Sequence, residues 1–316
     1  MSKIDREDIQ IISRNSNWSE AQIEKVLKEN VYNNKEAWYK FLRLFFISLG
    51  VGFTTAGIIF FFAYNWADLH KFVKLGLIEG IIVISTTFIL FSNLNIDIKN
   101  ILLTGTSIMV GVLFAVFGQV YQTGANAYDF FLGWTLFITL WVVVSNYTPL
   151  WFLFIILINT TLVLYWKQVA HDWTEVFMFT LIFIVNSGFL IASIFITKLL
   201  EVVKIPIWFS NTLALATVSC STIGVTLGIF EQQESSFYFL VLITTLLYIL
   251  GIYFALNSKS GFYLATISFS IIIIVSALLL NLSNDFMMLL FISLFVIASV
   301  TFVIKNLINL QKKWAN

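Results

Sequence analysis

The sequence predicts an all-α integral membrane protein, a polytopic bundle of about ten transmembrane helices. Its 316 residues are 59% apolar and only 11% charged, and the mean hydropathy is +0.91. A soluble domain is about 45–50% apolar and about 25% charged, so a soluble fold of this length could not cover its apolar surface with polar groups. Only two prolines interrupt the chain, which favours long helices. The lipid bilayer is therefore the expected surrounding of most residues.

Ten apolar segments have the length of about 17–25 residues that a helix needs to cross a bilayer. The fourth and fifth are separated only by Tyr147 and Thr148, and Pro149 opens the fifth. If one member of this pair is re-entrant, the number of spans falls to nine and the C-terminus changes sides. The ten segments are 43–64, 75–94, 100–119, 130–146, 149–166, 176–197, 207–230, 236–256, 260–281 and 285–305.

The first 40 residues are polar and of mixed charge, which predicts a small helical appendage on the membrane domain. Ser19 and Gln22 have the spacing of a capping box, so a helix is expected from Glu20 to about Asn30. A secretory signal would place an apolar core within the first ~15–30 residues, and this sequence does not have one there. The predicted organisation is a cytoplasmic appendage at 1–40, a transmembrane bundle at 41–306 and a cytoplasmic tail at 307–316.

Lysine and arginine residues are distributed unequally between the two sides of the predicted bundle. With the N-terminus in the cytoplasm, fifteen basic residues lie inside and three lie outside, namely Lys71, Lys74 and Lys167. Cytoplasmic loops of membrane proteins carry an excess of Lys and Arg. Both termini are therefore expected in the cytoplasm, which agrees with an even number of spans.

Small residues recur every four positions in the first, third and seventh spans. This spacing lets helix backbones approach closely, and it predicts helix-packing seams. The small and hydroxyl residues between Thr212 and Thr226 further predict that the seventh span is a central helix. The packing residues expected from these seams are Gly52, Ala56, Gly111, Ala115, Gly224 and Gly228.

Glu79 is the ionisable residue that lies within the second apolar segment. A carboxylate at the centre of a span costs roughly 2.5–3.5 kcal/mol on insertion scales, and such residues usually face the bundle interior or a water-filled cavity. The functional interpretation is an ion or proton relay, or a ligand contact. The alternative is a carboxyl group that hydrogen-bonds to a neighbouring helix or reaches the membrane interface.

A second group of polar residues lies at the outer ends of the first and third spans. If the first three helices are neighbours, these residues and Glu79 converge near one membrane face and form a candidate ligand or ion site. The alternative is an aromatic belt with ordinary loop polarity, since Tyr and Trp are enriched at membrane interfaces. Besides Glu79, the candidate residues are Asn65, Asp68, Gln119, Tyr121 and Gln122.

Several chemistries have no support in the sequence. It contains no zinc-protease, Walker A or nucleophile-elbow motif, so no enzymatic activity is expected. His70 and His171 fall in different loops, and the single cysteine, Cys220, lies within an apolar run, so neither a metal site nor a cofactor is expected. The net charge of +1 leaves no basic surface for nucleic acid.

The N-terminal half resembles a family of predicted bacterial membrane proteins, domain of unknown function 2157. The resemblance rests on the helical appendage, the Gly-x-Gly of the first span, the sequence Tyr64-Asn65-Trp66, and the sequence Gly118-Gln119-Val120-Tyr121-Gln122 before a Trp-bearing fourth span. It covers roughly residues 5–150. The resemblance implies a bacterial inner-membrane location, and it emphasises the same two segments that polarity singles out.

Two functions fit these features. The first is a transporter-like protein with a polar site near the outer leaflet, formed by the first three spans and using Glu79. The second is a non-transporting scaffold, sensor or assembly factor, with residues 1–40 as the part that binds a protein partner. The sequence does not set an oligomeric state.

Overall fold

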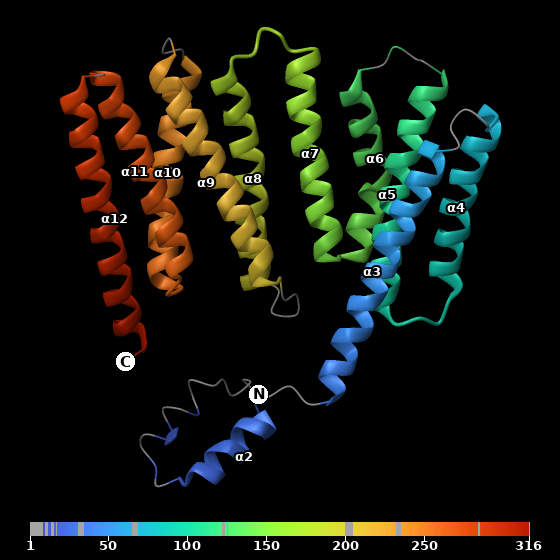
Figure 1. Ribbon diagram of the computed structural model, residues 1–316, viewed down its shortest axis with the longest axis horizontal. Helices are drawn as coiled ribbons and strands as arrows, with labels where there is room; N and C mark the ends of the chain where they lie inside the picture. The colour runs from blue at the N-terminus through green and yellow to red at the C-terminus, as the bar shows by residue number, and fades with distance from the viewer. Residues whose placement is uncertain are drawn as a thin grey trace. The chain divides into compact units, whose positions relative to one another are not determined.

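The computed structural model describes residues 9, 12–13, 16, 18–30, 35–64, 69–121, 124, 126–199, 205–231, 235–283 and 285–315, and the regular structure in these ranges is helical (Figure 1). Ten of the described helices are long and apolar enough to cross a membrane, which confirms the predicted fold class. They are α3 (Lys35–Tyr64), α4 (Lys71–Phe91), α5 (Ile96–Tyr121), α6 (Ala127–Ser145), α7 (Thr148–Gln168), α8 (Glu175–Leu199), α9 (Ile207–Phe230), α10 (Ser235–Asn257), α11 (Gly261–Leu282) and α12 (Phe286–Ala315).

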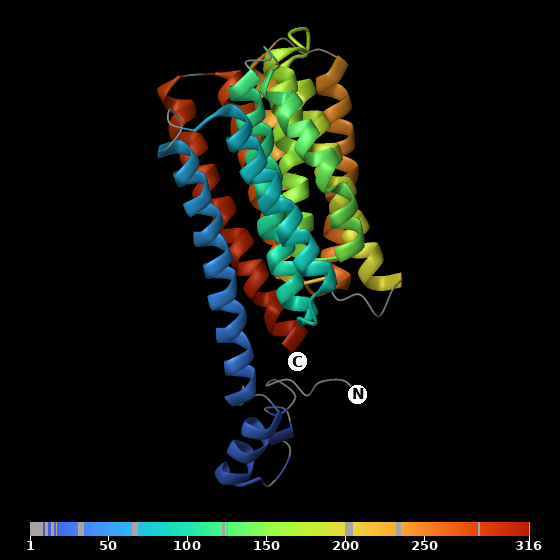
Figure 2. The ribbon, with the colours of Figure 1, turned by 90° about the vertical axis from the view of Figure 1, so that its right-hand side faces the viewer.

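The first and last of these helices extend well beyond the apolar segments that predict them. α3 begins at Lys35, eight residues before the predicted span, and Figure 2 shows it as one uninterrupted helix. α12 continues to Ala315 and takes in most of the segment 307–316. Hydropathy marks only the part of a helix that lies in hydrocarbon, whereas backbone hydrogen bonding continues into the polar interface.

The connection between α6 and α7 consists of Asn146 and Tyr147. Asn146 ends α6 in the left-handed conformation, with φ 45°, and Pro149 lies in the first turn of α7. The two helices have 19 and 21 residues and pack against each other. At about 1.5 Å per residue even the shorter one is close to the thickness of the hydrocarbon core, so both count among the ten spans.

The chain divides into two compact units, residues 1–121 and 122–316. In the N-terminal unit, α3 and α4 both pack against α5, through an apolar cluster that includes Phe62, Ile78 and Val116. The Lys40 ammonium lies 3.2 Å from the Asp97 carboxylate. Since both residues lie near the N-terminal ends of their helices, α3 and α5 start on the same side, as alternating spans require. The division into 1–40, 41–306 and 307–316 remains a prediction.

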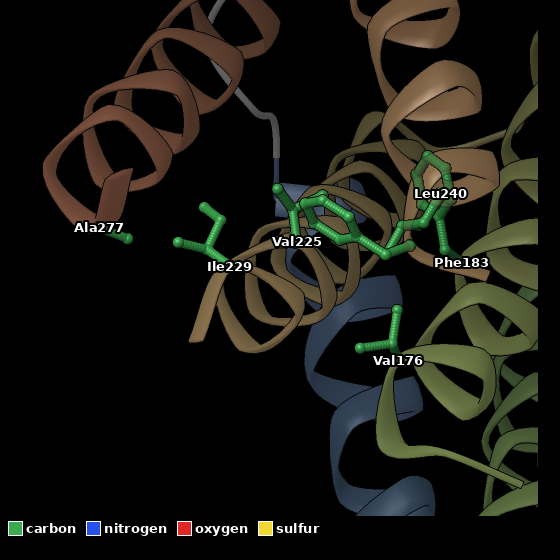
Figure 3. Close-up of a cluster of buried hydrophobic side chains, with 7 residues drawn as sticks. Val176, Phe183, Val225, Ile229, Leu240 and Ala277 are labelled. Atoms are coloured by element: carbon green, nitrogen blue, oxygen red, sulfur yellow. The ribbon is translucent and has the colours of Figure 1, made fainter. Parts of the chain in front are cut away.

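In the C-terminal unit, α9 packs against α8, α10 and α11. Figure 3 shows Val225 and Ile229 of α9 between Ala277 of α11 on one side and Phe183 of α8 and Leu240 of α10 on the other. Of the most apolar stretch of α9, 56% of the residues are buried, more than in any other described span. This confirms that the seventh span is a central helix.

α2 (Glu20–Asn30) precedes the spans and begins with the predicted capping box. The Ser19 amide donates to Gln22 Oε1 at 2.9 Å, and the Gln22 amide donates to Ser19 Oγ at 3.4 Å. Further along the helix, the Lys28 ammonium lies 2.8 Å from the Glu24 carboxylate, and through hydrogen bonding and charge it lowers the pKa of that carboxyl.

Ser19→Ala is expected to destabilise the first turn of α2 by about 0.5–1 kcal/mol, the lower part of the range for capping residues because the Ser19 bond is long. Amide hydrogen exchange of the full chain would show this as faster exchange at Gln22. Ser19→Asp keeps an acceptor at the same place and should retain the protection. Equal loss in both variants would contradict the capping role.

Candidate functional site

Glu79 lies on α4 with its side chain exposed, in contrast to the inward orientation that a relay needs. The face of α4 that packs inward carries Leu75, Ile78 and Ile89, which are at most 8% exposed. Residue 79 follows Ile78 by 100° around the helix axis, so its side chain leaves the helix at the flank of this packed face. The structure therefore places the carboxylate outside the packed interior of the N-terminal unit.

The other described candidates, Gln119 and Tyr121, occupy the last turn of α5 and are also exposed. The ring of Tyr121 packs against that of Phe117, with centroids 4.8 Å apart. Asn65, Asp68 and Gln122 lie outside the described residues. The three helices are neighbours at this end, but an apolar cluster joins them and the described polar groups point outward. The assignment of these residues to one site remains a prediction.

The N-terminal unit contains a cavity of about 400 Å³ between α3, α4 and α5. Its polar lining consists of the hydroxyl groups of Thr54, Thr55, Ser85 and Thr106, and Glu79 is not among its lining residues. The Thr106 hydroxyl donates to the Leu102 carbonyl at 2.9 Å. This cavity therefore has no ionisable group from the candidate set with which to exchange a proton or bind an ion.

The small residues predicted as packing seams differ in what surrounds them. A Cβ at Gly224 would lie 2.8 Å from Leu240 and 2.9 Å from Phe179, and one at Gly228 would collide with the Phe237 ring. A Cβ at Gly52 would meet nothing within 4 Å. Ala115 is exposed, and Ala56 and Gly111 are half-buried.

A close contact that the predicted seams do not include occurs at Gly105 in α5. A Cβ at this position would collide with the Val51 side chain of α3. Gly105 lies two residues before Ser107, a small residue that is fully buried and precedes Gly111 of the predicted seam by four positions. The sequence pattern found the correct stretch of α5 but not the residue in contact, because the crossing angle of two helices decides which small residue meets the partner.

The described core of the C-terminal unit contains a ring of hydroxyl groups that the sequence did not single out. Tyr248 Oη lies 2.8 Å from Ser221 Oγ and 2.6 Å from Ser270 Oγ, and Ser270 Oγ lies 2.6 Å from Thr222 Oγ1. The hydroxyls of Ser221 and Thr222 both donate to the Val218 carbonyl, at 2.9 and 2.6 Å. The four hydroxyl groups carry only four protons for these five short contacts, so no hydroxyl proton is left to donate to a ligand. The ring links α9, α10 and α11 as a packing element.

Asn159 and Asn186 form a second polar link, between α7 and α8. Each side-chain amide donates to the other's oxygen, at 3.1 and 2.9 Å, and each also donates to the backbone carbonyl four residues earlier, that of Ile155 or Ile182. Asn186 is 2% exposed. Intramembrane asparagines commonly hydrogen-bond across helices in this way, so this pair is a structural contact.

Among the described residues, no three His, Cys, Asp or Glu side chains are grouped closely enough to hold a metal ion. The described candidates Glu79, Gln119 and Tyr121 are exposed on the surface of the N-terminal unit. What these groups can do chemically is form hydrogen bonds or an ion pair with a molecule that approaches from outside the unit.

Comparison with known proteins assigns the N-terminal part of the chain. A model of the family described as Predicted membrane protein (DUF2157) matches residues 18–151. No curated protein and no solved structure matches the chain. The matched region contains the Asn65-Trp66 and Gly118–Gln122 motifs, and it ends just inside α7. Residues 18–151 thus match the family of predicted membrane proteins DUF2157, the resemblance that the motifs of this region predict.

Proposed function

We propose that this chain is a non-transporting membrane protein, a scaffold, sensor or assembly factor whose N-terminal unit contacts other proteins. The observation that carries this proposal is the exposure of Glu79 on α4. A carboxylate that served a transport pathway would face a bundle interior or a water-filled cavity. A carboxylate on the outer surface of a helix is instead placed to meet a partner.

The packing of the N-terminal unit supports the same proposal. Only 6% of the most apolar stretch of α3 and 17% of that of α4 are buried, against 56% for α9. Helices so thinly covered by their own unit have wide faces open to lipid or to other spans. Interfaces between transmembrane helices are built from such faces.

We infer a bacterial inner-membrane location with both termini in the cytoplasm. The distribution of basic residues, fifteen on one side and three on the other, supports this orientation. The appendage at residues 1–40 would then face the cytoplasm, where α2 presents Ile23, Val26 and Leu27 along one half-buried side. No catalytic activity is part of the proposal.

The competing function is transport through a polar site near the outer leaflet, and a flux assay separates the two. The full chain is reconstituted in liposomes that enclose a pH-sensitive dye, beside Glu79→Gln and protein-free liposomes. We expect a proton flux equal to that of protein-free liposomes for both the natural chain and the variant. A flux carried by the natural chain and lost in Glu79→Gln would overturn the proposal.

The protein-contact half of the proposal has a separate readout in cells. A photo-crosslinking amino acid at Lys25, an exposed position of α2, is expected to give a discrete adduct with one protein. The same amino acid at Phe302, which is 66% exposed on α12, serves as the control for random collisions in the membrane. Identical adduct patterns at both positions would count against a specific contact at the appendage.

A further inference from the structure

We propose that the outward face of α4 around Glu79 binds a transmembrane helix of another protein, and that this helix presents a lysine or arginine to the Glu79 carboxylate. The inference rests on the proposed function, because it names the kind of partner that the N-terminal unit contacts. It commits to a basic membrane helix as the occupant of this face.

The outward face of α4 is a continuous stripe. Gly76, Glu79, Val83 and Thr87 are all exposed, and at 100° per residue they fall within about 80° of one another around the helix axis. Val83 is 62% exposed. This stripe begins beside the packed face of α4 and extends over its far side, so a helix can lie along it without displacing α3 or α5.

The charge on this stripe has no counterion among the described residues. Glu79 lies eight residues after the start of α4, about 12 Å along the helix axis, and Val83, one turn further along the same face, is an exposed apolar side chain. The nearest cations in sequence are directed elsewhere. Lys71 lies over the Phe72 ring, 5.3 Å from its centroid, and Lys74 is buried on the packed face, at 7% exposure. Charge complementarity therefore selects a cationic partner.

Gly76 on this stripe and the half-buried Gly80 at its edge leave room for close approach. A Cβ at Gly76 or at Gly80 would meet nothing within 4 Å, and the two residues have the four-residue spacing at which helix backbones come together in membranes. Gly224 and Gly228 in the C-terminal unit have the same spacing but are already filled by neighbouring side chains. The α4 pair is an equivalent seam without its second helix.

The alternative occupants fit less well. Acyl chains cover apolar side chains but offer no positive charge to a carboxylate. A second copy of the chain, packed on this face about a two-fold axis, would bring two Glu79 side chains together. Two carboxylates in contact repel each other. A helix with a basic residue removes both costs, because it pairs with the carboxylate and can pack closely against Gly76 and Gly80.

The test uses a synthetic transmembrane helix as the probe. Its sequence is polyleucine with a Gly-x-x-x-Gly seam and one lysine placed to meet Glu79, and a second peptide with leucine at that position is the comparison. Cys220 is the chain's single cysteine, so His70→Cys in a Cys220→Ser background gives one site for a donor dye at the start of α4. Energy transfer to labelled peptide is measured in vesicles of phosphatidylethanolamine and phosphatidylglycerol.

We expect the lysine peptide to bind about tenfold more tightly than the leucine peptide, the upper end of polar couplings measured between membrane helices. Glu79→Gln should abolish this preference, and Gly80→Leu should weaken the binding of both peptides. Gly52→Leu is the matched control, because Gly52 is an equally open glycine on α3 with no carboxylate beside it in the sequence. It should leave the preference unchanged.

Three outcomes would overturn the inference: equal binding of the two peptides, a lysine preference that survives Glu79→Gln, or self-association of the labelled chain that Gly80→Leu abolishes. The third would assign the face to a second copy. Glu79→Gln has nearly the same shape as the natural residue. The comparison of the lysine and leucine peptides on this variant therefore still decides the question if Gly80→Leu fails to fold. If the chain prefers the lysine peptide and also carries protons across liposomes, the proposed non-transporting function is wrong but this inference stands. If it shows neither the preference nor the proton flux, only this inference is wrong.

Discussion

Gly228→Ala is expected to destabilise the C-terminal unit by about 1–3 kcal/mol, although alanine is the better helix former. The added Cβ would collide with the Phe237 ring and lie 2.9 Å from its Cε2 atom. Phe237 is 8% exposed and belongs to the core cluster that α9 centres, so the ring cannot rotate into lipid. Thermal unfolding of the purified chain in detergent measures the effect as a lower transition temperature.

Two further variants separate the clash from a general effect of losing glycine. Gly188→Ala, on α8, adds a Cβ with nothing within 4 Å, so it should leave the transition unchanged or raise it slightly. Phe237→Leu removes the ring, and in that background Gly228→Ala should cost less than in the natural chain. If Gly188→Ala destabilised the protein as much as Gly228→Ala, close packing of α9 against α10 would not be the cause.

Asn159→Leu and Asn186→Leu are each expected to destabilise the C-terminal unit by about 1–2 kcal/mol, because each leaves the partner amide, buried in Asn186 and half-buried in Asn159, with fewer hydrogen bonds. The cost is limited, since the remaining amide still donates to Ile155 or Ile182 of its own helix. The double variant should cost less than the sum of the two. Unfolding in mixed detergent measures all three.

The double-mutant cycle gives the coupling between the two asparagines directly. A value of about 0.6–1.7 kcal/mol is the range found for hydrogen bonds between membrane helices. A cycle of the same kind between Asn159 and Ser270, which lies in the hydroxyl ring and not in the amide pair, should give a coupling near zero. Additive effects of Asn159→Leu and Asn186→Leu would contradict an amide pair that links α7 to α8.

The positions of the spans were predictable because hydrocarbon imposes a length and a composition on every helix that crosses it. The direction in which a helix faces was much less so. On α4, Leu75 and Ile78 point inward while Val83 and Ile84 point outward, yet all four are apolar. In a soluble protein the outward face of a helix is polar, so the apolar residues identify the face that packs inward. In a membrane both faces are apolar, and the sequence no longer distinguishes them.

The contacts between helices were predictable only in kind. The abundance of hydroxyl groups between Thr212 and Thr226 indicated that α9 is central, and it is. That Ser221 and Thr222 in this stretch meet Tyr248 and Ser270 depends on crossing angles that no local pattern encodes. The orientation of Glu79 depends on the same information, and for that reason a carboxylate that the sequence suggests as a relay lies on the surface.

The two-residue connection at Asn146 and Tyr147 also determines how this part of the chain enters the membrane. Between Lys99 and Lys167 the sequence contains no lysine or arginine, so the loop before the fourth span and the turn after it carry no basic residue. A turn of two residues, with Asn146 in the left-handed conformation, is too short to let one helix insert while the other waits outside. The two spans therefore cross as one antiparallel hairpin, and the side on which α7 ends follows from the side on which α6 begins.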